Sequence, residues 1–131
     1  MKQRVLWSSL AIAATFLVGA ALAAKPLMRW WMHSRPFSAE RFDPAKWKAG
    51  LAASQDGECV RGRMANDVIS TIVVAGTPRQ QVENILGPPQ RAENGWTDYE
   101  LGMCSGLRID YDSLHVDYAE DKVVRAYHVQ H

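Results

Sequence analysis

The hydrophobic pattern separates an uninterrupted apolar stretch at the start of the chain from a region of shorter periods after it. Residues 5–24 carry no charge and follow Lys2 and Arg4. A basic start, an apolar run and an alanine-rich end at 21–24 are the layout of a secretory signal peptide. The run is also long enough, at roughly 20 residues, to span a bilayer as a helix. We therefore expect residues 1–24 to be a cleaved signal peptide or a retained membrane anchor.

The residues that follow the apolar run bear on both interpretations. Trp30 and Trp31 stand among basic residues, and this composition suits a helix end anchored at a membrane interface. The run itself is alanine-rich and only modestly hydrophobic, which suits a cleaved signal. The predicted location is thus the periplasm, either free after cleavage or tethered to the inner membrane by residues 5–24. No cysteine lies near the cleavage region to carry a lipid, so the chain is not expected to be a lipoprotein.

A stretch without a sustained period occupies residues 25–58 and is rich in proline and glycine. We interpret it as a linker and lead-in, and residues 59–131 as the folded domain. Three aromatic side chains of the lead-in, Phe37, Phe42 and Trp47, are placed to dock on a core.

Two stretches of the domain have the helical period. The first has one apolar face and ends at Gly76, and the second ends at Gly87 before two prolines. Thr77 is expected to cap the second helix, with Pro78 at its first position. The two apolar faces consist of Met64, Val68, Ile69, Ile72 and Val73, and of Val82, Ile85 and Leu86.

Apolar and polar residues then alternate, as in strands with one wet face. The alternating segments are 97–101, 107–111, 114–118 and 123–129, with a hairpin turn at 120–122. We predict an α+β domain in which two short helices pack on a three-stranded antiparallel sheet, in the order ααβββ. The predicted core is Met64, Val68, Ile72, Val82, Leu86, Leu114, Val116 and Val124.

Charge and cysteine content narrow the class of protein. Without Lys2 and Arg4, 13 basic residues stand against 14 acidic ones, so nucleic-acid binding has no electrostatic support. Cys59 and Cys104 are the two cysteines, and in an oxidising compartment an even count predicts a disulfide. A redox pair lacks the usual Cys-x-x-Cys spacing, and two unpaired thiols are the remaining alternative.

Catalytic and metal-binding chemistry has little support in the sequence. His115, His128 and His131 match no zinc-ligand spacing, and a solvated strand face with a frayed tail also explains them. Asp110 and Asp112 fit a turn, because Asp favours such positions. We expect no cofactor and no enzyme activity. The alternative is a metal-binding or small hydrolytic envelope protein that uses His115, His128 and nearby carboxylates.

Several segments between residues 42 and 130 resemble the BamE (SmpA/OmlA) domain family. The main one is GTPRQQVENILGPP at 76–89, and YELG at 99–102 and the hairpin at 114–124 are similar to further segments of that family. The lead-in residues that join the resemblance are Phe42, Asp43, Trp47, Lys48, Asp67 and the run 61–64. Unlike BamE itself, the chain has no lipid-attached cysteine and carries two internal ones.

The resemblance implies a non-catalytic envelope protein that binds other envelope proteins, with a role in outer-membrane or envelope assembly or maintenance. We predict a protein-interaction module with partners in the cell envelope. The expected contact residues are Arg108, His115 and Asp117 on the polar sheet face, together with the loop 102–106. Ordinary solvated surface explains the same residues equally well.

Overall fold

In a computed structural model of the chain, the backbone is described for residues 2–131 and the side chains for residues 14–131. The chain divides into two compact units, residues 1–31 and 32–131. Helix α1 (Lys2–His33) accounts for the described part of the first unit, and its last two residues belong to the second unit. Among the described residues, no helix combines the length and the hydrophobicity needed to cross a membrane. The side chains of residues 5–13, within the predicted signal or anchor, lie outside the described part.

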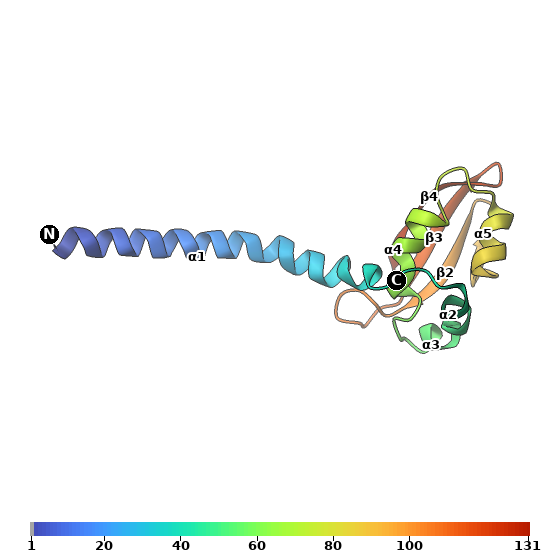
Figure 1. Cartoon of the computed structure of the whole chain (residues 1–131), viewed down its shortest axis with the longest axis horizontal. Helices are drawn as coiled ribbons and strands as arrows, with labels where there is room; N and C mark the ends of the chain where they lie inside the picture. The colour runs from blue at the N-terminus through green and yellow to red at the C-terminus, as the bar shows by residue number, and fades with distance from the viewer. Residues whose placement is uncertain (1) are drawn as a thin grey trace. The chain divides into compact units, whose positions relative to one another are not determined.

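The second unit carries short helices followed by one sheet (Figure 1). Its strands are all antiparallel and lie in the order β1-β2-β3-β4. The helical elements are η1 (Arg35–Ser38), α2 (Pro44–Ala49), α3 (Leu51–Gln55), η2 (Gly62–Met64), α4 (Ala65–Thr71) and α5 (Arg79–Leu86). The strands are β1 (Arg91–Glu93), β2 (Trp96–Gly102), β3 (Asp112–Ala119) and β4 (Lys122–Gln130).

The predicted three-stranded ααβββ fold is wrong, because the sheet has four strands and the described part of the chain has five α-helices. Strand β1 is three residues long and fully exposed, so it has no alternating pattern to reveal it. The segment 107–111 alternates but is not a strand, since it belongs to the loop between β2 and β3. The predictions for 97–101, 114–118 and 123–129 fall within β2, β3 and β4.

A bulge between β3 and β4 decides which residues of β4 are buried. Asp117 pairs with Arg125 and Tyr118 pairs with Val123, so Val124 is the extra residue. Val123 is consequently 3% exposed and Val124 is 54% exposed. The prediction of Val124 as a core residue is therefore wrong, because the bulge reverses the alternation at this point.

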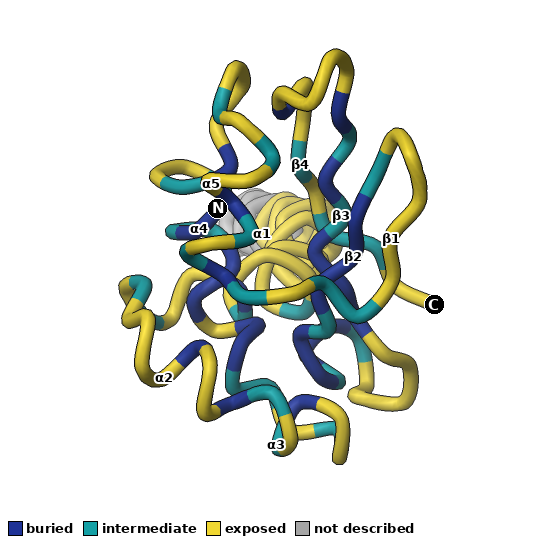
Figure 2. The backbone as a smooth tube through the Cα atoms, turned by 90° about the vertical axis from the view of Figure 1, so that its right-hand side faces the viewer, coloured by how far each residue is buried: buried dark blue, intermediate teal, exposed yellow. Residues whose placement is uncertain are grey.

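The core lies between the helices and one face of the sheet. Six predicted core residues are buried: Met64, Val68, Val82, Leu86, Leu114 and Val116. Ile72 is only partly buried against them. Figure 2 shows the buried positions concentrated in β2 and β3, with β1 and the turns exposed.

Trp47 of α2 is the largest fully buried side chain. Asp43 starts this helix as its N-cap, since its carboxylate accepts the Lys46 N–H at 2.8 Å. The guanidinium of Arg61 lies 4.8 Å from the centre of the Trp47 ring, and its Nε donates to the Trp47 carbonyl at 2.8 Å. Burial lowers the pKa of Arg61 to about 10. The lead-in thus supplies central core contacts.

The helix ends differ from those predicted. Helix α4 ends at Thr71, well before Gly76. The N-cap of α5 is Pro78 and has no side-chain cap, so the predicted Thr77 cap is wrong. The reason is that Thr77 lies in an extended segment whose carbonyl accepts the Val123 N–H at 2.9 Å, while the Gly76 N–H donates to the Val123 carbonyl at 2.8 Å.

A disulfide joins Cys59 and Cys104, as predicted. It connects the turn after α3 to the end of β2 and lies against Gly62. A Cβ at position 62 would be 2.0 Å from Sγ of Cys104. Glycine is therefore required here by the close approach of the disulfide rather than by its backbone angles.

Candidate functional site

A row of polar and aromatic side chains crosses the face of the sheet that is turned away from the core. The strand register pairs Arg91 with Asp98, Asp98 with His115, and His115 with Tyr127, so one residue from each strand stands in line. Directly opposite residues on one face of a sheet are close enough for their side chains to interact. We call Arg91, Trp96, Asp98, His115, Asp117, Arg125 and Tyr127 the outer-face cluster.

His115 is held between two carboxylates at the centre of this cluster. Its Nδ1 lies 2.6 Å from Oδ1 of Asp98, and its Nε2 lies 3.1 Å from Oδ1 of Asp117. A neutral imidazole has one N–H and donates to one carboxylate, whereas the doubly protonated ring donates to both. Asp98 is 4% exposed, so this carboxylate is almost completely buried. Its Oδ2 also lies 3.2 Å from Nη2 of Arg91.

The two arginines complete the charge pairing. Nε of Arg125 lies 2.5 Å from Oδ2 of Asp117. This contact, with a smaller contribution from His115, holds the pKa of the Asp117 carboxyl below its ordinary value. The same carboxylate raises the pKa of Arg125. Both groups stay charged over the physiological range as a result.

Aromatic rings lie side by side along the same row. The Trp96 ring lies over the His115 ring at 5.2 Å between centres, and His115 lies 5.1 Å from the Tyr127 ring. The Arg125 guanidinium stands 5.0 Å from the centre of the Tyr127 ring. His115 is thereby fixed by rings on two sides and by carboxylates on two others. At the edges of the cluster, Arg91 and Arg125 are exposed.

Of the three predicted contact residues, His115 and Asp117 lie together and Arg108 lies elsewhere. Arg108 is exposed in the β2–β3 loop, where its backbone φ is 58°. Sequence reasoning missed Arg125 and Trp96. The strand register identifies them, because it places both residues opposite Asp117. Their residue types alone do not indicate this position.

The histidines proposed for the metal-binding alternative do not meet. His128 pairs with the buried Leu114, and the next pair, His115 with Tyr127, points to the other face of the sheet. The His128 ring stacks on Phe37 at 4.0 Å, and burial lowers the pKa of this imidazole. No group of three potential ligands converges among the described residues. Asp98 and Asp117 engage opposite nitrogens of His115, so these three side chains leave no common vacant position.

Asp112, considered above as a turn carboxylate, is buried and organises the β2–β3 loop. Its Oδ2 accepts the N–H groups of Cys104 and Ser105, each at 2.7 Å, and its Oδ1 accepts the Ser105 hydroxyl at 2.6 Å. These donors use both carboxylate oxygens. Asp112 is therefore a structural anchor beside the disulfide.

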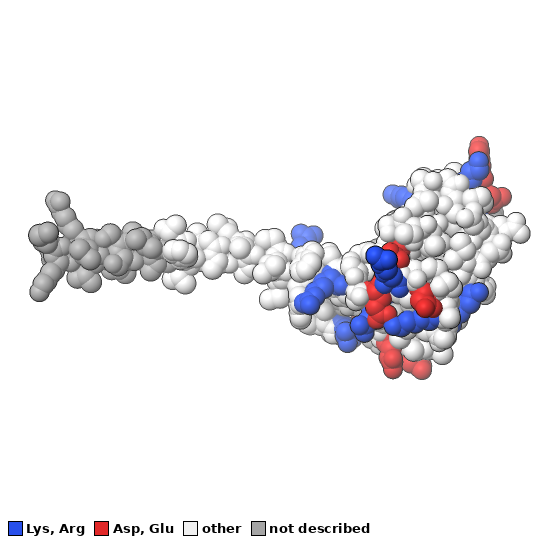
Figure 3. Space-filling view, in the orientation of Figure 1, with Lys and Arg blue, Asp and Glu red and all other residues white. Residues whose placement is uncertain are grey.

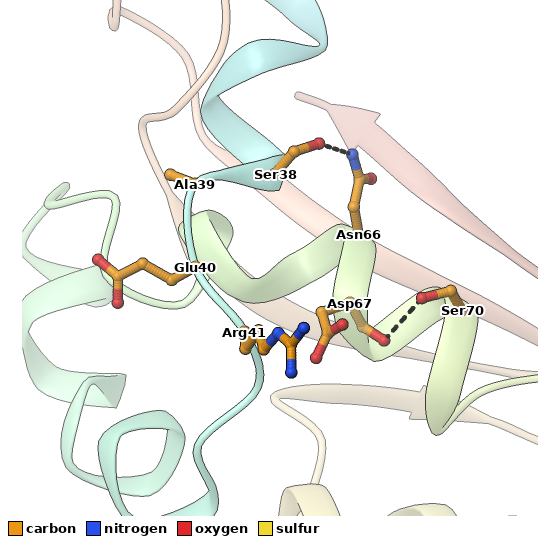
Figure 4. A pocket seen from close by; sticks show the side chains of 7 residues that line it. All are labelled: Ser38, Ala39, Glu40, Arg41, Asn66, Asp67 and Ser70. Carbon is orange, nitrogen blue, oxygen red and sulfur yellow. Dashed lines mark hydrogen bonds between the residues drawn. The ribbon is translucent and has the colours of Figure 1, made fainter.

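A polar hollow of about 340 Å³ lies between residues 38–41 and α4 (Figure 4). Asn66 donates to the Ser38 hydroxyl at 2.5 Å, and Ser70 donates to the Asp67 carbonyl at 3.1 Å. The Asp67 carboxylate accepts the Phe42 N–H at 2.7 Å. The bonds from Asn66 and to Asp67 dock the lead-in on α4, and the Ser70 bond is internal to that helix, which together explain the polar lining of the hollow.

Charges of both signs are mixed on the face of the second unit that Figure 3 displays. This distribution agrees with the near-neutral composition of that part of the chain. Comparison with known proteins adds no further constraint, because no family model, no curated protein and no solved structure matches the chain. The similarity to the BamE domain therefore stays a hypothesis.

Proposed function

We propose that this chain is a non-catalytic protein of the cell envelope that binds another envelope protein. The observation that carries the proposal is the outer-face cluster, in which His115 stacks on Trp96, lies beside Tyr127 and is held by two carboxylates. Aromatic and arginine side chains that are already ordered lose little conformational freedom on binding. Such residues are enriched at protein interfaces.

Two features support the envelope as the location. The apolar stretch 5–24 after a basic start has the layout of an export signal or anchor. The disulfide between Cys59 and Cys104 is typical of an oxidising compartment such as the periplasm. A role in envelope assembly or maintenance, implied by the resemblance to the BamE family, belongs to the same proposal.

Site-specific photo-cross-linking in intact cells of the native host tests the proposal. A photoreactive phenylalanine analogue replaces Tyr127, which is 37% exposed on the cluster, in the full chain. The matched control carries the analogue at Val74, which is 43% exposed outside the cluster. We expect a discrete adduct with another envelope protein from position 127 and none from position 74. Equal labelling at both positions, or none at either, would contradict a binding role for this face.

A further inference from the structure

The segment 107–111 has the sequence pattern of a strand but no strand partner. Leu107, Ile109 and Tyr111 alternate with Arg108 and Asp110, which is the pattern of a strand with one apolar face. All three apolar side chains are exposed, at 78%, 70% and 40% respectively. Positions where a strong local pattern disagrees with the fold are often functional. A group of exposed apolar side chains close together in the chain, here called the apolar stripe, marks an interaction surface more often than an isolated exposed residue does.

The stripe is held in place rather than loose. At its start, Cys104 is fixed by the disulfide and the Asp112 carboxylate, and the Arg108 N–H donates to the Ser105 carbonyl at 3.1 Å. Arg108 closes this turn with a positive φ of 58°, a conformation that costs energy for a residue other than glycine.

The other end of the stripe is tied as well. The Tyr111 hydroxyl donates to the Gln55 carbonyl at 3.0 Å, and the Tyr111 carbonyl accepts the His131 N–H at 2.9 Å. The segment therefore presents Leu107 and Ile109 to solvent with both of its ends fixed, and little ordering remains to be done on binding.

The charges between the apolar residues indicate the chemistry of the partner. Arg108 makes no ion pair among the described side chains, while Asp110 carries a negative charge two positions away. An anionic lipid surface would attract the first and repel the second. A protein segment can instead place an acidic group opposite Arg108 and a hydrogen-bond donor opposite Asp110, with an apolar side chain against Ile109 between them.

We propose that residues 107–111 are a second contact surface of this chain and bind an apolar, acid-bearing segment of another envelope protein. This inference rests on the proposed binding function and names the surface and the chemistry of the partner. It differs from the outer-face cluster, which is polar and whose charges are already paired within the domain.

The test uses the full chain in intact cells of the native host, with the photoreactive analogue at position 107, 127 or 74. We expect position 107 to give one protein adduct, and mass spectrometry to map the linkage to an apolar segment with an acidic residue. That protein is then purified and its affinity measured against the wild-type chain and the double variant Leu107→Ser/Ile109→Ser. The expected loss is about tenfold or more, as for hot-spot residues, whereas Val74→Ser leaves the affinity unchanged.

Several outcomes would overturn the inference. It would be wrong if position 107 gave only a lipid adduct or an adduct with a second copy of this chain. It would also be wrong if the double variant bound with unchanged affinity. A partner captured at position 127 and not at 107 would overturn this surface and leave the proposed function intact, whereas capture at neither position would overturn both. The thermal midpoints of the variants and the wild type are compared, and equal values show that the variants are folded. Leu107→Gln is a second variant, for use if the double variant does not fold.

Discussion

The indole N–H of Trp47 donates a hydrogen bond to the backbone carbonyl of Leu86 at 3.0 Å, and both residues are fully buried. Trp47 comes from the lead-in, and Leu86 is the last residue of α5. This bond satisfies one of the carbonyls that a helix leaves unpaired at its C-terminal end. The part of the lead-in from residue 32 onward therefore belongs to the same compact unit as the domain.

Shortening this side chain should destabilise the whole unit. Trp47→Ala is expected to lower the free energy of unfolding by about 3–5 kcal/mol, the range for large-to-small changes in a core. Trp47→Phe keeps most of the volume but leaves the Leu86 carbonyl unpaired, at a cost of about 1–3 kcal/mol. Urea titration followed by circular dichroism measures both. Trp31→Phe is the control, because that residue is 55% exposed. If it lowered the free energy of unfolding as much as Trp47→Phe does, the stabilising role of the Trp47 hydrogen bond would be contradicted.

Removal of the disulfide should also be costly. The bridge closes a loop of about 45 residues, which corresponds to roughly 4 kcal/mol in the chain-entropy model. The double variant Cys59→Ser/Cys104→Ser is expected to unfold at a correspondingly lower urea concentration.

Gly62→Ala should destabilise the oxidised protein, because its Cβ would lie 2.0 Å from Sγ of Cys104 and 2.8 Å from Sγ of Cys59. If the oxidised Gly62→Ala protein were as stable as the wild type, the inferred close packing of Gly62 against the disulfide would be wrong.

The buried carboxylate beside the disulfide gives a prediction about the loop. Asp112→Ala leaves the N–H groups of Cys104 and Ser105 without an acceptor, at an expected cost of about 1–3 kcal/mol for each buried donor that stays unpaired. Hydrogen exchange at these two amides should accelerate more than that of the β3 amides. Asp110→Ala is the matched control, because that carboxylate contacts only the exposed Gln130 side chain in the described part of the structure.

The stability of the unit should fall on mild acidification because of His128. Burial lowers the pKa of this imidazole from its ordinary value near 6.5, and Asp112 opposes the shift only in part. The unfolded chain therefore binds a proton at a higher pH than the folded one. The contribution of His128 is fully present above the unfolded pKa and is lost as pH falls from about 6.5 through the lower folded pKa.

Urea midpoints between pH 7.5 and 5 measure this dependence. His128→Phe keeps a ring to stack on Phe37 and cannot titrate, so its stability should change less over the same interval. An identical pH dependence in the variant and the wild type would show that other groups cause the effect. Glu40 and Asp117 do not interfere, because nearby cations lower the pKa of both carboxyls and move their titration to more acidic conditions.

The sequence predicted the parts of this fold that depend on local periods. The apolar face of Val82 and Leu86, the end of α5 at Gly87 and the paired cysteines all follow from spacing and residue type. The number of strands did not follow, because pairing depends on contacts between distant residues. Strand β1 is recognisable only from its register with β2, and the exposure of Val124 only from a bulge opposite Asp117.

The candidate sites divide in the same way. His115 and Asp117 could be placed together because they are two residues apart on one strand. Asp98 and Arg125 join them from neighbouring strands, which no local pattern reveals. The segment 107–111 is the opposite case, since its local pattern is strong and the fold of the single chain does not use it.

The position of the disulfide also sets an order of events during synthesis. The two cysteines enclose η2, α4, α5, β1 and all of β2. Because Cys59 precedes Cys104 by 45 positions, its thiol has no native partner until the chain through Cys104 has been made. A product truncated anywhere in this interval keeps that thiol, so the reactivity of Cys59 distinguishes finished molecules from incomplete ones.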